Sequence, residues 1–133
     1  RQGSTRAPQW TGGGVVFAPV PRDYSFKMNK KEKRAALKSA LTSRVQANKL
    51  IVLDQLTMDA PKTKAMQNVL NSLNVNKALV VTKENNANVV LSARNIPSVK
   101  TALVNTINVY DVMKYNTVVL TKDAVAAIEE VYA

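Results

Sequence analysis

The 133-residue sequence contains no cysteine and no histidine, and these two absences exclude much of enzyme chemistry. Without cysteine there is no disulfide framework and no thiolate metal site. Without histidine the chain lacks the most frequent general base and the most frequent metal ligand. No group of acidic residues has the spacing of a metal site either. We therefore expect a protein that is not an enzyme and that needs no metal or cofactor.

Aromatic residues and long apolar runs are also scarce. Aromatics make up 5% of the sequence, so a core must be built from aliphatic side chains. No apolar run approaches the roughly 18 residues that a membrane helix needs, and we expect no membrane partner. The length suits one domain with one core.

Phosphate-loop and nucleophile motifs are missing as well. The sequence has no Walker-type loop, no dinucleotide-binding glycine fingerprint and no nucleophile elbow. The run Gly12–Gly14 stands alone and indicates a flexible or tightly turning segment. Asp54 and Asp59 follow the first expected strand, where sites of α/β proteins often lie. Isolated acids at such a place are more often turn and cap residues, so we assign no catalysis to them.

Positive charge is abundant and unevenly distributed. The formal net charge is +10 and the isoelectric point is about 10.0, which favours a polyanionic partner. Residues 1–44 hold ten of the nineteen basic residues but two of the nine acids. The signal for polyanion binding therefore lies almost entirely in the first third of the chain.

Residues 1–28 differ in composition from the rest of the chain. They contain all four glycines and three of the five prolines, and they show no apolar periodicity. This pattern predicts an extended basic arm rather than a packed element. Residues 29–133 are expected to form a separate globular domain.

The second segment alternates between helical and strand patterns. Asn29 followed by Glu32 is typical of a helix capping box, and helix-forming residues continue to position 48. Asp59 and Pro61 signal a second helix start. Strands are expected at 50–53, 78–82, 100–104 and 117–120. Shorter helices are expected at 86–93 and 110–114, and a final helix after Thr121. The positions expected on buried helix faces are Met66, Val69, Leu70 and Leu73, then Val125, Ile128 and Val131.

Strands that alternate with helices indicate parallel pairing through right-handed crossovers. Their continuous apolar runs indicate that helices cover both faces of the sheet. The expected fold class is α/β, a small sandwich with a mostly parallel sheet flanked by helices, plus the extended basic N-terminal arm.

The first helix carries its cations in an unexpected place. Lys30, Lys31, Lys33 and Arg34 fall within its first two turns, where the positive end of the helix dipole makes cations unfavourable. A phosphate backbone beside that end would reverse the sign of this effect. The alternative is a solvated lysine face that other contacts hold in place.

The arm combines arginines with aromatic residues. Arginines bind phosphates or stack on bases, and aromatic rings stack on unpaired bases. These features favour structured RNA over duplex DNA. The alternative is that Trp10 and Phe17 fold back onto the α/β body. The RNA-facing residues expected in the basic third are Arg1, Arg6, Trp10, Arg22, Lys27, Lys30, Lys31, Lys33, Arg34 and Lys38.

Several stretches resemble the bacterial family of large-subunit ribosomal protein L4. The resemblance rests first on the segments 1–10, 12–17 and 21–25, then on Asn29-Lys-Lys with 36–41. It continues through 60–64, Ser92-Ala-Arg-Asn95 and the C-terminal Ala124-Val with Glu129-Glu130. It covers the whole chain, and its first stretch is the most specific.

The resemblance implies a protein of the cytoplasmic ribosome, with large-subunit ribosomal RNA and neighbouring ribosomal proteins as partners. It implies a basic loop that threads into RNA near the peptide exit tunnel, and an early role in subunit assembly. It adds Arg94 and Asn95 as a second RNA-facing set. It also implies a possible second partner, the protein's own messenger leader, through which some members repress their operon.

The sequence departs from the family pattern at two places. It begins with Arg1, inside the returning arm of the loop, so we expect about the first third and the tunnel-lining tip to lie upstream. Thr11 stands where the family commonly has an arginine, which would weaken one RNA contact. Without the family's first strand, we expect residues 1–133 alone to be marginally stable.

Two other classes of function remain open. A nucleotide-binding α/β enzyme is disfavoured by the missing motifs, and saturable nucleotide binding by residues 45–133 would revive it. A regulator that binds a messenger leader would use the same cations, and only the identity of the bound RNA distinguishes it.

Overall fold

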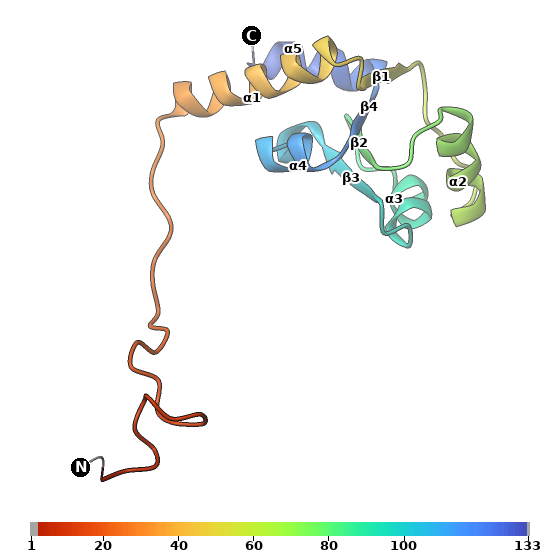
Figure 1. Cartoon of the computed structure of the whole chain (residues 1–133). Helices are drawn as coiled ribbons and strands as arrows, with labels where there is room; N and C mark the ends of the chain where they lie inside the picture. The colour runs from red at the N-terminus through yellow and green to blue at the C-terminus, as the bar shows by residue number, and fades with distance from the viewer. Residues whose placement is uncertain (1–2, 133) are drawn as a thin grey trace.

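Four parallel strands form the central sheet of the computed structural model, which describes residues 3–132 (Figure 1). The spatial order of the strands is β1-β4-β2-β3. Ala78 in the central strand β2 is aligned with both Val99 and Thr117. The strands are β1 (Leu50–Leu53), β2 (Ala78–Thr82), β3 (Val99–Leu103) and β4 (Thr117–Thr121). The all-parallel sheet confirms the α/β part of the expected fold class.

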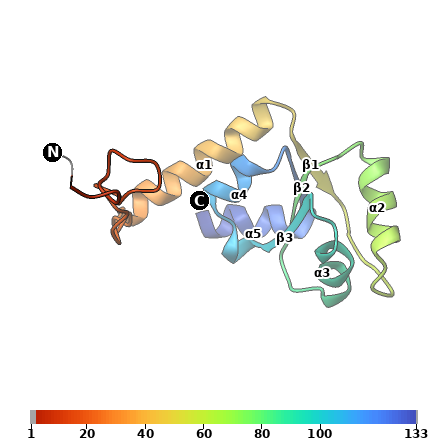
Figure 2. The same cartoon turned by 60° about the horizontal axis from the view of Figure 1, so that its bottom comes forward.

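Helices cover both faces of this sheet and make three layers (Figures 1 and 2). One face is covered by α1 (Lys30–Gln46), α4 (Val109–Lys114) and α5 (Lys122–Tyr132). The other is covered by α2 (Thr63–Ser72) and α3 (Ala87–Arg94). A short 3-10 turn, η1 (Val104–Thr106), joins β3 to α4.

Strand β2 has four consecutive apolar residues because both of its faces are buried. Leu79 and Val81 point to the side of α1, α4 and α5, whereas Ala78 and Val80 point to the side of α2 and α3. All four are buried. Successive side chains of a strand face opposite sides, so a strand with helices on both sides needs apolar residues at every position.

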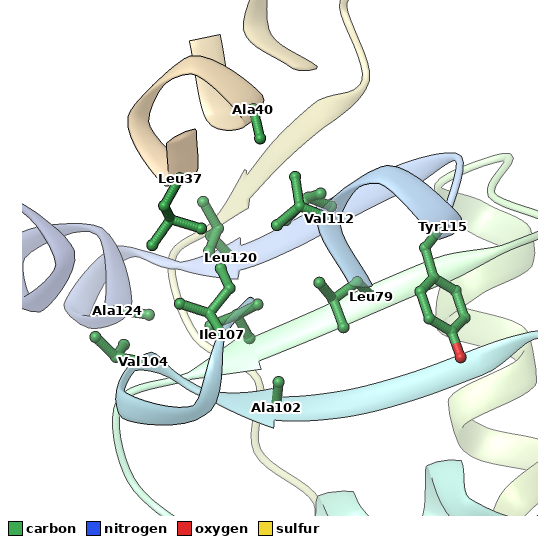
Figure 3. Packing of buried hydrophobic residues seen from close by; sticks show 12 residues of the cluster. Leu37, Ala40, Leu79, Ala102, Val104, Ile107, Val112, Tyr115, Leu120 and Ala124 are labelled. Atoms are coloured by element: carbon green, nitrogen blue, oxygen red, sulfur yellow. The ribbon is translucent and has the colours of Figure 1, made fainter. Parts of the chain in front are cut away.

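Helix α1 is held to the sheet by a narrow apolar stripe. Leu37 and Ala40, three residues apart, are its two buried residues and point toward Leu120 and Val112 (Figure 3). Arg44 adds a polar contact at the end of the helix. Its Nε donates to the carbonyl oxygen of Val112 at 2.9 Å and its Nη2 to that of Met113 at 2.7 Å. The charged side chain thereby satisfies carbonyl groups at the C-terminal end of α4.

Two local expectations were wrong. Helix α2 begins at Thr63 rather than at 59–61, because contacts from α3 hold the preceding residues in an extended form. Asn88 Nδ2 donates to the carbonyl oxygen of Met58, and the backbone N–H of Lys62 donates to Ser92 Oγ. Val131, expected on the buried side of α5, is 45% exposed, and the buried residue of that helix is Ala124.

Residues 3–28 form no helix or strand. In Figure 1 this segment leaves the N-terminal end of α1 and runs away from the sheet. Phe17 is 93% exposed and Phe26 is 83% exposed, so neither packs into the body. The alternative in which Phe17 folds back onto the α/β domain is therefore wrong.

Candidate nucleic-acid interface

The first element of the candidate interface is the N-terminal half of α1. The helix begins at Lys30, and the Glu32 carboxylate accepts the backbone N–H of Asn29 at 3.0 Å, as the capping-box pattern predicts. Leu37 and Ala40 are the two buried residues of the helix, and most of the basic residues precede them, toward its N-terminal end. All five of them are exposed: Lys30, Lys31, Lys33, Arg34 and Lys38.

These cations have no carboxylate partner in the described part of the chain. Across residues 3–132, one ion pair occurs within 4.0 Å, and it joins Lys100 to Asp111 on the body. The lone acid of the first helical turn, Glu32, is engaged by the Asn29 backbone. The positive end of the helix dipole and these five unpaired cations therefore create a positive potential around the N-terminal half of α1.

The second element is the arm. Arg22 and Lys27 are both exposed, and the guanidinium of Arg22 lies 4.8 Å from the ring centre of Tyr24. A hydrogen bond from the Ser25 backbone, and a second from its hydroxyl, lower the pKa of the neighbouring Asp23 carboxyl. The expected residues Arg22 and Lys27 thus lie on the segment that leads directly into α1.

The far end of the arm is a closed loop, defined here as the Trp10 loop (Ser4–Gly14). The N–H of Gly14 donates to the carbonyl oxygen of Arg6 at 2.9 Å and closes it. Two turns lie inside, from Ala7 to Trp10 at 3.0 Å and from Trp10 to Gly13 at 2.9 Å. Trp10 is 50% exposed. The expected residues Arg6 and Trp10 therefore lie on one small structured unit, whereas Arg1 lies outside the described residues.

The second expected set is separate from the first. Arg94 is the last residue of α3 and Asn95 follows it as the C-cap, and both are exposed. Helix α3 covers the opposite face of the sheet from α1. The two sets therefore do not form one continuous surface. If Arg94 and Asn95 bind RNA, they bind a different part of it from the part that α1 contacts.

A hollow of about 610 Å³ lies at the carboxyl ends of the strands. Sequence reasoning considered Asp54 there but missed Glu84 and Asp123, because the three acids are far apart in sequence and meet only in the fold. Their carboxylates outnumber the single cation of the lining, Lys83. Such a lining repels phosphates, so it does not suit a nucleotide. No metal-binding group of acids was found among residues 3–132.

A smaller hollow, of about 460 Å³, lies against α1 on the face of the sheet that α1, α4 and α5 cover. Met28, Leu37, Ile107 and Tyr132 give it an apolar lining. Lys33 and Arg34 also line it, so the cations of α1 stand beside an apolar recess. This recess adjoins the junction between the arm and the helix.

Asp111, which is buried in the body, has a structural role. Burial alone would raise the pKa of Asp111, but hydrogen bonds from Lys100 at 2.6 Å and Asn108 at 2.8 Å outweigh it and lower that pKa. The hydrogen bond to Asp111 in turn raises the pKa of Lys100. Lys100 is thereby paired with a carboxylate of the body and does not belong to the unpaired cationic surface.

The fold and the charge distribution define a small α/β protein with an uncompensated cationic surface on its first helix and the preceding arm. The family model of the ribosomal protein L4/L1 family matches residues 1–131. The chain belongs to this family, as its sequence resemblance indicated. For the residues that the structure describes, no helix is long and apolar enough to cross a membrane.

Curated relatives agree with this assignment. The chain is 71% identical to "Large ribosomal subunit protein uL4" of Lachnoclostridium phytofermentans and 68% identical to that of Agathobacter rectalis. It is 58% identical to the protein of the same name from a Thermoanaerobacter strain. Each alignment covers all of this chain and 65% of the relative, so the chain spans about two thirds of their length.

Proposed function

We propose that this chain is a structural constituent of the large ribosomal subunit in the cytoplasm, and not an enzyme. It binds large-subunit ribosomal RNA through the arm, residues 1–28, and through the first helix of the α/β domain, residues 29–133. Family membership supports the ribosomal assignment, because the relatives named above are large-subunit proteins. Neighbouring ribosomal proteins are its further partners.

One observation carries this proposal: the exposed, unpaired cations at the start of α1. Their position is unfavourable for folding, since both the helix dipole and their mutual repulsion oppose it. A phosphate group placed there accepts hydrogen bonds from the free N–H groups and neutralises the cations. RNA binding thereby turns an unfavourable arrangement of charges into a favourable one.

The arm extends the same surface away from the body. Residues 15–28 lie between the Trp10 loop and α1, and fourteen extended residues span up to about 45 Å. Val15, Phe17 and Tyr24 are each more than 70% exposed. Exposed apolar side chains of this size are costly in water and suggest burial against a partner. An arm with cations and exposed rings suits the interior of folded RNA, where it would support assembly and the region of the peptide exit tunnel.

The test is retention of the chain on total RNA across a salt series, with sequencing of the RNA that stays bound. Six neutralised phosphates predict a log–log salt slope of about −4 to −5. Enrichment of large-subunit ribosomal RNA with such a slope would support the proposal. Enrichment of the protein's own messenger leader instead would favour the autoregulatory alternative. If a folded chain retains no RNA at low salt, both are wrong.

A further inference from the structure

The Trp10 loop is closed by hydrogen bonds within its own backbone. Its closure, from Gly14 to Arg6, is a backbone hydrogen bond between residues eight positions apart, and the two inner turns share the Trp10 backbone. Trp10 donates its N–H to Ala7 and accepts the N–H of Gly13 with its carbonyl oxygen. Because both of its backbone groups are engaged, the Cα position of Trp10 is restricted while half of its surface stays open.

Two glycines make this closure possible. A Cβ at Gly13 would overlap the carbonyl oxygen of Ala7, one of the acceptors of the loop, and would lie 3.0 Å from the carbonyl oxygen of Trp10. Gly12 has a φ of +78°, in the region that favours glycine. By contrast, a Cβ at Gly3 would meet no atom within 4 Å. Gly12 and Gly13 are therefore structural requirements of the loop and not a flexible hinge.

We propose that the Trp10 loop is a preformed receptor for one unpaired RNA base, which stacks on the Trp10 indole. Arg6, at the closure of the loop, binds a phosphate next to that base. The inference rests on the proposed RNA-binding function and adds the kind of nucleotide that the arm recognises. A base inside a duplex has neighbours on both of its faces, so only an unpaired base offers a face to the indole.

A preformed loop binds more tightly than a flexible one, because its ordering cost is met during folding of the free protein. This makes Gly13 a positioning residue: it carries no side chain that could touch RNA, yet its replacement should weaken binding. Gly13→Ala must open the loop or strain it, which predicts a loss of roughly ten-fold in affinity. Removal of the ring in Trp10→Ala predicts a loss of about five- to hundred-fold.

The fluorescence of Trp10 tests the inference directly, because it is the only tryptophan of the chain. The probes are two RNA hairpins of the same stem, one with a single unpaired bulged base and one fully paired. Total large-subunit ribosomal RNA serves as a third probe and reports the proposed function by itself. Stacking predicts that the bulged hairpin quenches the fluorescence at lower concentrations than the paired hairpin.

Four variants of the 133-residue chain complete the experiment, and a gel-shift titration with the same hairpins measures binding by the two variants that lack tryptophan. Gly3→Ala is the matched control and should bind the bulged hairpin as the parent does, whereas Gly13→Ala should bind it more weakly. Trp10→Phe keeps an aromatic face and should retain most of the affinity that Trp10→Ala loses. All variants should melt at the temperature of the parent, since the loop lies at the far end of the arm from the sheet (Figure 1).

The outcomes separate this inference from the proposed function. Two results together support the preformed receptor. The bulged hairpin quenches Trp10 fluorescence selectively, and Gly13→Ala binds it more weakly than the parent whereas Gly3→Ala does not. Retention of ribosomal RNA with unchanged Trp10 fluorescence, or with equal binding of Gly13→Ala and Gly3→Ala, overturns the receptor and leaves the proposed function intact. A folded chain that retains no ribosomal RNA overturns both.

Discussion

Neutralising the start of α1 should weaken RNA binding and stabilise the protein at the same time. The change is the fourfold variant Lys30→Gln, Lys31→Gln, Lys33→Gln and Arg34→Gln. All four side chains are exposed and none has a carboxylate partner among residues 3–132, so the variant breaks no ion pair there. Glutamine is about as good a helix former as lysine or arginine, so the helix itself should persist.

The two effects can be estimated from the structure. Each cation that binds a phosphate contributes about 0.7–0.9 to the log–log salt slope, so four neutralised cations should lower its magnitude by about 3. Four like-charge pairs are lost at helical spacing: Lys30 with Lys33, Lys30 with Arg34, Lys31 with Arg34, and Arg34 with the retained Lys38. Together with the relief at the positive end of the helix, this predicts roughly 1–2 kcal/mol of added stability. The melting temperature should rise by roughly 3–8 °C.

The assays are RNA retention over a salt series and thermal melting by circular dichroism. The matched control carries the same loss of charge elsewhere on the body, as Lys49→Gln, Lys64→Gln, Lys83→Gln and Lys122→Gln, all exposed positions. The control should keep a steeper salt slope than the α1 variant. Equal slopes for the two variants would show that net charge alone binds RNA, and the role of α1 would be refuted. If the α1 variant melts at a lower temperature than the parent, the cations at the start of α1 do not destabilise the fold.

Three further predictions concern the body. Arg44→Met removes two hydrogen bonds to carbonyl groups of α4 and should lower the free energy of unfolding by about 1–3 kcal/mol, measured with urea; a cost equal to that of Lys49→Met would show that these hydrogen bonds do not stabilise the fold. The pKa of Asp111 is lowered from 3.8, so its contribution is present above that pH and is lost as the pH falls through the lower pKa of the folded state. The melting temperature should therefore fall below about pH 4, less steeply in Asp111→Asn, and identical pH profiles would refute this role. Leu79→Ala, at a fully buried position, should cost about 2–5 kcal/mol of unfolding free energy without changing the salt slope of the folded protein; a cost below that of an exposed-site change such as Leu91→Ala would contradict its place in the core.

The helices and strands were largely predictable because their signals are local. The strands at Leu50–Leu53 and Ala78–Thr82 match the expected bounds, since continuous apolar runs between polar turns leave few alternatives. The first helix starts one residue after Asn29, as its capping pattern indicates. The start of α2 was missed because residues of α3, about thirty positions away, hold the preceding segment. No local pattern reports such a contact.

The charge of the candidate interface was predictable from the sequence, whereas its shape was not. The excess of basic residues before position 45 can be counted in the sequence, and the first helix was expected to carry several of them. The Trp10 loop was expected only as a flexible or tightly turning segment. Its closure depends on the absence of a side chain at Gly13, because a Cβ there would overlap the carbonyl oxygen of Ala7. Only the three-dimensional structure shows that these two residues lie so close together. The set of RNA contacts itself stays a prediction.

The sequence by itself determined the class of fold, the exclusion of cysteine and histidine chemistry, and the location of the excess positive charge in the first third of the chain. These follow from composition and from periodicities set by neighbours in the chain. Only the tertiary structure decided the order β1-β4-β2-β3, the separation of Arg94 from α1, and the meeting of Asp54 with Glu84 and Asp123. These depend on which apolar faces pack together over long sequence distances, and that choice is made by the free energy of the whole core rather than by any one segment.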